Sequence, residues 1–166
     1  MPQNTSSDTV TDSPTMPTKT SETKAEKGGS QTAKEAHVSE LLAELDGKSE
    51  TTQRPVIDEI VAMGGVAIKP LAKALGSGAS FQVRMASATA LGELRDEKCV
   101  APLVAALADS SLNVQRAAVH ALSLLGDPAV APLLESINSP EDSVRRWSAE
   151  VLGKLGKKEV VEVLIA

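Results

Sequence analysis

The stretch VQRAAVHALSLL, residues 114–125, decides the fold of this chain because a variant of it stands on each side. The variants are VRMASATALGEL at 83–94 and VRRWSAEVLGKL at 144–155, so the three begin 31 and 30 residues apart (114 − 83 and 144 − 114). Most residues at i, i+3, i+4, i+7, i+8 and i+11 of each stretch are apolar, which places a stripe on one side of an α-helix. A fixed period of about thirty residues predicts stacked helical units.

The composition of the 166 residues suits a core of small aliphatic side chains. Hydrophobic residues make up 42%, but aromatic residues only 1%, namely Phe81 and Trp147. Ala, Val, Leu and Ile must therefore fill the core, as in closely packed helical layers. The net charge of −5 argues against a nucleic-acid partner, and the absence of a run of 18 apolar residues argues against a membrane span.

The repeat extends upstream of these three stretches. Residues 38–45 align without a gap with 130–137, an offset of 92 (130 − 38) that is close to three repeats. Each unit is predicted to hold two short helices, with Gly or Pro after the first. We therefore predict an all-α fold with a repeat domain over 32–166. The first helices are expected at 52–63, 83–94, 114–125 and 144–155, and the second helices at 33–46, 67–75, 99–108, 129–137 and 159–166.

Residues 1–31 are rich in Ser and Thr and almost free of apolar side chains. Such a segment buries too little apolar surface to offset the entropy of ordering, so a disordered tail is predicted. It serves as a solvated tether or carries a short linear binding motif. It lacks the apolar stretch of a secretory signal and the Arg residues of an organelle transit peptide, so we expect a cytoplasmic protein.

The last residues, 159–166, enter a second helix that stops before its final turn. A stack of repeats needs a polar cap at each end, whereas Val161, Leu164 and Ile165 leave an apolar edge. Two hypotheses follow: the chain is a fragment or truncated member of a repeat family, or its open end docks on another protein.

These units resemble the short HEAT-like repeats of the phycobilisome (PBS) lyase family. The resemblance rests on the three stretches quoted above and on Leu-Gly-Asp-Pro at 125–128, and it covers about residues 52–166. It implies a right-handed α-solenoid whose second helices line the concave face. The family includes bilin lyases, their partner subunits and scaffolds without catalytic activity, so the resemblance specifies a fold more closely than a function.

The sequence contains few residues that could carry chemistry. HEAT-like deoxyhypusine hydroxylases hold a di-iron centre with several His-Glu pairs, whereas neither His37 nor His120 is followed by Glu. His120 is predicted to face solvent because its counterparts in the neighbouring units are polar. Cys99 is expected to be a buried or half-buried thiol. The alternative, a nucleophilic or bilin-handling thiol, would need a nearby base or cationic group, and only Lys98 is adjacent. We predict no catalytic residue, no metal site and no cofactor.

Arg84 and Arg145 occupy the same position in their units, with Gln115 between them. In HEAT-like stacks such Arg residues pair with carboxylates of the turns, so the resemblance implies a structural ladder of ion pairs. A phosphate or nucleic-acid site is the alternative, which the acidic total disfavours. The carboxylates available to such a ladder are Asp96, Asp127 and Asp109.

Trp147 breaks the small-residue pattern, because its counterparts are Ala86 and Ala117. A Trp strains a layer that is already full. Either Trp147 fills space left by a differently packed neighbour, or it faces a groove that binds a ligand or partner. On the second helices, the residues expected to contact a partner across the concave face are Lys69, Lys73 and Glu135.

The sequence therefore predicts a non-catalytic protein-interaction scaffold. Its partner is expected to be another protein, bound on the concave face or at the open C-terminal edge. The alternative is a phycobilin lyase or a lyase subunit, which binds a linear tetrapyrrole and transfers it to a cysteine of a phycobiliprotein. Only this alternative requires a bilin.

Overall fold

The computed structural model describes residues 22–156, with side chains from residue 29 onward. The described part of the chain is built from α-helices and short 3-10 helices. In chain order these are α1 (Glu22–Ala43), α2 (Glu50–Ala62), η1 (Gly64–Ala67), α3 (Ile68–Gly76), α4 (Phe81–Leu94), η2 (Glu97–Cys99), α5 (Val100–Ala105), η3 (Ala106–Ala108), α6 (Leu112–Leu125), α7 (Asp127–Ser136) and α8 (Asp142–Leu155).

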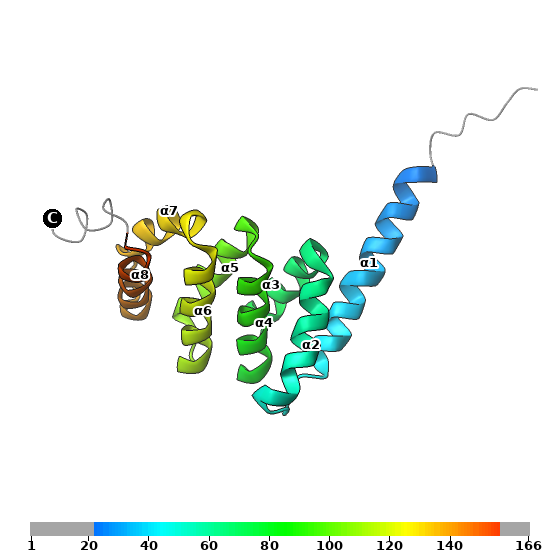
Figure 1. Cartoon of the computed structure of the whole chain (residues 1–166), viewed down its shortest axis with the longest axis horizontal. Helices are drawn as coiled ribbons and strands as arrows, with labels where there is room; N and C mark the ends of the chain where they lie inside the picture. Colours follow the sequence, from blue (N-terminus) through cyan, green and yellow to red (C-terminus); the bar gives the residue numbers. More distant parts are fainter. Residues whose placement is uncertain (1–21, 157–166) are drawn as a thin grey trace, which may run out of the picture.

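The helices alternate between two layers along the stack (Figure 1). The first helices of the units, α2, α4, α6 and α8, lie side by side in one layer, and α1, α3, α5 and α7 form the other. Helix α4 packs against both α2 and α6, α6 also packs against α8, and α3 packs against α1 and α4. This arrangement confirms the predicted solenoid of helix pairs, in which each unit contacts mainly its neighbours.

The core runs between the two layers and confirms the expected aliphatic composition. Three polar residues are buried as well, namely Gln53, Ser87 and Ser148. Nε2 of Gln53 donates to the carbonyl oxygens of Leu45 (3.3 Å) and Lys48 (2.9 Å), which fixes the turn after α1. The largest fully buried side chains are Leu45, Ile60, Leu71, Leu91, Leu103, Leu107, Leu122, Leu133, Leu152, Gln53, Val38 and Val114.

Three of the first helices, α4, α6 and α8, are followed directly by a residue with positive φ, whereas α2 is followed by Met63 and then Gly64 with φ 67°. Gly126 and Gly156 follow α6 and α8 with φ of 69° and 62°. Arg95 takes this place after α4 with φ 51° and ψ 31°, and its backbone N–H donates to the carbonyl oxygen of Gly92. The missing glycine at 95 therefore does not change the type of cap, although a side chain in this conformation carries a steric cost.

Two glycines at matching repeat positions have different roles. A Cβ built on Gly92 would lie 2.6 Å from the Cβ of Ala121, so the glycine permits close approach of α4 and α6. No described atom lies within 4 Å of a Cβ built on Gly153. Close helix packing therefore accounts for Gly92 but, among the described residues, not for Gly153.

The first helix differs most from the sequence prediction. The helix expected at 33–46 is part of α1, which begins earlier, at Glu22, and ends at Ala43. Residues 22–31 carry no clear apolar stripe, but their Glu, Lys and Ala residues have high helix propensity. Helix therefore crosses the predicted boundary between tail and repeat domain, and the domain limits themselves stay a prediction.

Two other predictions fall on residues outside the described part. These are the disorder predicted for residues 1–21 of the tail and the apolar edge predicted from the helix at 159–166. Among the described residues, no helix is long and apolar enough to cross a membrane.

Candidate functional site

The outward side of α2, α4, α6 and α8, which we call the first-helix face, carries two adjoining grooves. One has a volume of about 570 Å³ and is lined by residues of α2, α4 and α6. The other has a volume of about 520 Å³ and lies between α6 and α8. Arg116 and His120 line both grooves, so the two form one surface that crosses the repeat units.

Trp147 lies at this surface but is mainly a core residue. Its side chain is 9% exposed and lines the groove between α6 and α8 with its remaining surface. The indole Nε1 donates to Oε1 of Gln115 at 2.8 Å, and the guanidinium of Arg146 lies 4.6 Å from the ring centroid. Trp147 therefore both fills space between the helices and borders a groove, and packing is its larger role.

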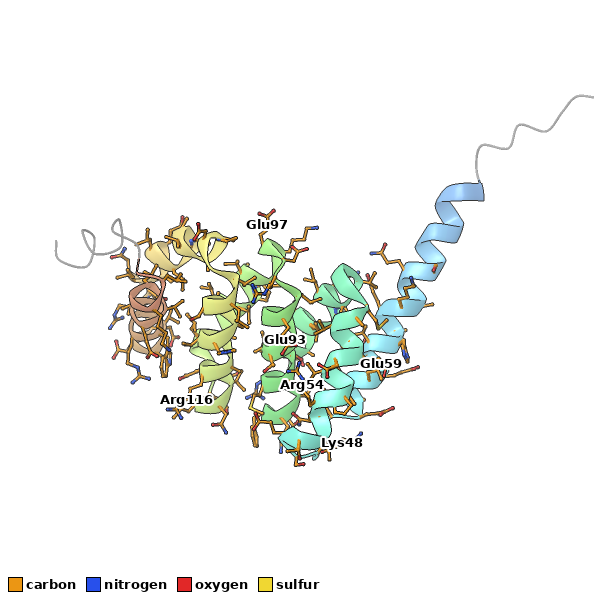
Figure 2. All side chains as sticks on the ribbon, in the orientation of Figure 1. Lys48, Arg54, Glu59, Glu93, Glu97 and Arg116 are labelled. Atoms are coloured by element: carbon orange, nitrogen blue, oxygen red, sulfur yellow. The ribbon has the colours of Figure 1, made fainter. Side chains whose placement is uncertain are left out.

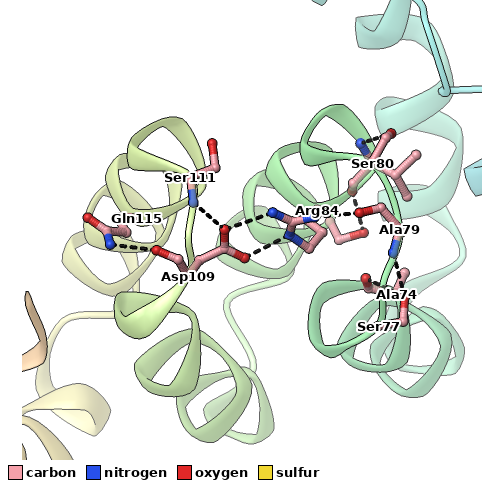
Figure 3. Close-up of polar contacts among 10 residues, drawn as sticks. Ala74, Ser77, Ala79, Ser80, Arg84, Asp109, Ser111 and Gln115 are labelled. Atoms are coloured by element: carbon pink, nitrogen blue, oxygen red, sulfur yellow. Dashed lines mark hydrogen bonds and ion pairs between the residues drawn. The ribbon is translucent and has the colours of Figure 1, made fainter. Parts of the chain in front are cut away.

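Arg84 and Asp109 join two repeat units by a two-point ion pair (Figure 3). Nε of Arg84 donates to Oδ2 of Asp109 at 2.7 Å, and Nη2 donates to Oδ1 at 2.9 Å. Burial of the Asp109 carboxyl would raise its pKa. The hydrogen bonds from Arg84 and the Ser111 N–H outweigh burial, together with the Arg84 charge, so the pKa lies below its ordinary value.

The Arg/Gln position of the repeat has a shared function that the sequence did not reveal. The side chains of Arg84, Gln115 and Arg145 each donate to a backbone carbonyl in the loop that precedes their own helix. Since Gln115 keeps this contact at 2.6 Å without a charge, the hydrogen bond to the loop is the common feature. The accepting carbonyls belong to Ala79, Asp109 and Ser139, which are spaced by one repeat.

The structure corrects the predicted ladder partners. Asp96 follows the C-terminus of α4, at the far end of the helix from Arg84, and its carboxylate accepts from the Lys98 N–H. Asp127 begins α7, where its charge suits the helix N-terminus. Arg145 pairs with Asp142, three residues earlier in α8, so this contact does not link two units. Of the residues predicted to form the ladder, Arg84 makes a cross-unit pair, and its partner is Asp109.

The predicted partner-binding residues of the second helices lie on the surface but do not form one site. Lys69 and Lys73 both lie on α3 beside a groove of about 320 Å³ against α1, and the Lys69 side chain, 82% exposed, contacts Glu35 at 3.4 Å. Glu135 is exposed on α7, two second helices further along the stack.

The cysteine and His37 lie in surroundings that do not suit a catalytic or metal-binding role. Cys99 is fully buried, and burial raises the pKa of its thiol to about 11. His37 lies near the carboxylates of Glu40 and Glu59 on the exposed side of α1 and α2. Within the described residues, no three His, Cys, Asp or Glu side chains are grouped so that they could hold a metal ion.

Comparison with known proteins identifies the repeats. The chain matches the family of HEAT repeats over residues 68–153 and the PBS lyase HEAT-like repeat over residues 144–166. The match to HEAT repeats covers more than half of the 166 residues (153 − 67 = 86).

Two relatives are a phycocyanin operon protein and a phycocyanobilin lyase subunit. The chain is 28% identical over 138 residues to uncharacterized phycocyanin operon protein Z of Pseudanabaena tenuis (strain PCC 7409), covering 78% of this chain and 68% of that protein. It is 37% identical over 81 residues to phycocyanobilin lyase subunit alpha of Picosynechococcus sp. (strain ATCC 27264 / PCC 7002 / PR-6). That match covers 44% of this chain but only 30% of the lyase subunit, so the shared part is a fraction of the relative's length.

Solved structures agree on the fold. The complex of CpcE and CpcF of phycocyanin lyase from Nostoc sp. PCC7120 superposes with a TM-score of 0.59 at 22% identity, over 78% of this chain and 86% of that chain. Human deoxyhypusine hydroxylase superposes with a TM-score of 0.52 at 26% identity, over 74% of this chain and 43% of that one. The chain belongs to the HEAT-repeat family, and its residues 144–166 match the PBS lyase HEAT-like repeat.

Proposed function

We propose that this chain is a HEAT-repeat subunit of a bilin-attaching assembly of the phycobilin lyase type. The observation that carries the proposal is the 37% identity over 81 residues to phycocyanobilin lyase subunit alpha. The 28% identity to a phycocyanin operon protein, which spans most of both chains, supports the same reading. These relatives favour the lyase alternative over the generic scaffold that the sequence predicts first.

The side chains favour a subunit rather than an enzyme complete in itself. Attaching a bilin to a cysteine requires the thiolate of that cysteine as nucleophile. Cys99 does not suit this role, because it is fully buried and its pKa is raised to about 11. The accepting cysteine then belongs to the phycobiliprotein, and this chain contributes surface that holds the bilin or the acceptor.

The arrangement of the helices suits such a role. Grooves occur on both layers of the stack: one of about 440 Å³ between α3 and α5, and those of the first-helix face. Surfaces on opposite layers allow one chain to contact two proteins at once, as a subunit of an assembly must. A single-chain scaffold would use the same surfaces but would need no bilin.

The visible spectrum of a bilin distinguishes these two functions. Phycocyanobilin is mixed with the purified chain and apo-phycocyanin, with apo-phycocyanin alone as the control. We expect a shifted and strengthened absorption band that depends on the chain, because a bound bilin loses the conformational freedom it has in solution. A spectrum identical to the control would favour the scaffold and count against the proposal.

A further inference from the structure

Two arginine side chains on the first-helix face have no acidic partner among the described residues. Arg54 on the same face is held by Glu93 at 2.6 Å and by Asp58 at 2.7 Å, and Lys154 is paired with Glu150. Arg116 and Arg146 are exposed, and no carboxylate of the described residues lies within ion-pair distance of either. In a chain of net charge −5, two free guanidinium groups on one surface form a local positive site.

Arg116 lines the groove between α6 and α8, and Arg146 stacks on a side chain that lines the same groove. Arg116 lines this groove from α6 and extends from the N-terminal part of that helix (Figure 2). Arg146 lies over the ring of Trp147, which lines the groove from α8. Stacking on an aromatic ring leaves the edge N–H groups of a guanidinium available for a carboxylate, which it binds with two parallel hydrogen bonds.

We propose that this groove docks an acidic segment of a partner protein, whose carboxylates pair with Arg116 and Arg146. The site is independent of the proposed bilin function. Its chemistry favours a peptide over the bilin, because the one aromatic ring at the groove is 9% exposed and already covered by Arg146. A conjugated ligand would find little ring surface on which to stack.

The extent of the surface also fits a peptide in extended conformation. The grooves on either side of α6 share Arg116 and His120 and therefore reach from α4 to α8. Neighbouring packed helices lie about 8–10 Å apart, so this distance is roughly 16–20 Å. An extended chain rises about 3.3 Å per residue, so about five or six residues span it.

The test uses acetylated, amidated hexaglutamate as the probe and the fluorescence of Trp147, the one tryptophan of the chain, as the signal. We expect a saturable change that weakens with added salt, because exposed charges are screened. Arg116→Glu and Arg146→Glu should each lower the affinity about tenfold, since each replaces an attraction by a repulsion. Arg116 is exposed, so Arg116→Glu should keep the melting temperature of the parent chain. Arg146→Glu also loses the contact with the ring of Trp147, so its affinity is measured well below its own melting temperature.

Lys98→Glu is the matched control, because it makes the same change of charge on an exposed residue of another edge. Lys98 is adjacent to Glu97, which lies at the opposite edge of the stack from Arg116 (Figure 2). This variant should keep its affinity within about twofold, as expected for a distant surface charge. A loss as large as that of Arg116→Glu, or no saturable change in the parent chain, would overturn the proposal.

Two further outcomes assign the groove to another occupant and also overturn the proposal. One is displacement of hexaglutamate by phycocyanobilin, and the other is self-association of the chain that Arg116→Glu abolishes. The proposed function is tested separately. Bilin attachment without hexaglutamate binding would reject the docking site alone, and hexaglutamate binding without bilin attachment would reject the bilin function alone.

Discussion

Arg84 and Asp109 connect adjacent repeat units through two parallel hydrogen bonds, of 2.7 Å and 2.9 Å. Their side chains are only 15% and 9% exposed, so solvent screens the pair weakly. Arg84 also donates to the carbonyl of Ala79, and Asp109 accepts from the N–H of Ser111. One ion pair thus fixes the loops before α4 and α6 relative to each other.

Removing the charge of Asp109 should destabilise the stack and change its response to acid. Asp109→Asn should lower the free energy of unfolding by about 1.5–3 kcal/mol at pH 7, the range for hydrogen bonds to charged groups. Because the native pKa of Asp109 is lowered, its ionised form stabilises the fold at pH values above about 3.9, the unfolded value, and this stability is lost as pH falls through the native pKa. Urea unfolding from pH 6 to pH 2.5 measures both effects.

The exposed pair of Arg54 and Asp58 provides the control for this experiment. Both side chains are 54% exposed, so Asp58→Asn should cost less than about 1 kcal/mol. Equal losses in the two variants, or an acid response of Asp109→Asn identical to that of the parent, would show that the buried pair has no special role.

Substitution by alanine should have opposite effects on stability at Gly92 and at Gly153. Gly92→Ala should destabilise the chain by about 1–3 kcal/mol, because the new methyl group would lie 2.6 Å from the Cβ of Ala121. Gly153→Ala should stabilise it by about 0.5–1 kcal/mol, because alanine favours the helix and meets no described atom within 4 Å. Thermal unfolding of both variants checks the prediction, and effects of the same sign would contradict it.

The packing of Trp147 can be separated from its hydrogen bond by two substitutions. Trp147→Ala should lower the free energy of unfolding by about 3–5 kcal/mol, because it empties a buried site. Trp147→Phe retains an aromatic ring but leaves Oε1 of Gln115 without its donor at 2.8 Å, so the loss should be smaller. Chemical denaturation measures both losses. An unchanged stability of Trp147→Ala would mean that the ring serves partner binding and not packing.

The thiol of Cys99 should be inert in the folded chain. Its pKa of about 11 leaves almost no thiolate at pH 8, and burial excludes reagents from the sulfur. We expect the absorbance assay with Ellman's reagent to show no fast reaction until denaturant is added, and then one thiol per chain, since Cys99 is the one cysteine. Rapid labelling of the native chain at pH 8 would contradict the fully buried position.

The sequence predicted the layers of the fold better than the contacts within them. The spacing of Val83, Val114 and Val144 was sufficient for the helix pairs, because apolar periodicity reflects which side of a helix is buried. The sequence offered Asp109 as one of three possible partners of Arg84 but could not choose among them, because that contact depends on how two units rotate against each other. The start of α1 at Glu22 was missed because propensity without an apolar stripe is a weak signal.

On the first-helix face, too, the sequence did not predict the contacts between side chains. Trp147 was recognised as exceptional because alanine occupies its place in the other units, but its donor bond to Gln115 and its contact with Arg146 required the structure. Arg116 and Arg146 lie near the starts of α6 and α8 and match no pattern that would mark them as binding residues. Only the ion pairs of their neighbours distinguish them as free cations among the described residues.

Covalent attachment of a bilin tests the proposed function most directly. Phycocyanobilin and apo-phycocyanin are incubated with this chain and with either CpcE or CpcF, and zinc-induced fluorescence of the denatured acceptor reports the attached bilin. We predict attachment when the chain is combined with one of the two proteins, and none when the chain is omitted or the acceptor cysteine is replaced by Ala. Attachment that is equal without the chain, or that is absent with either protein, would contradict the account.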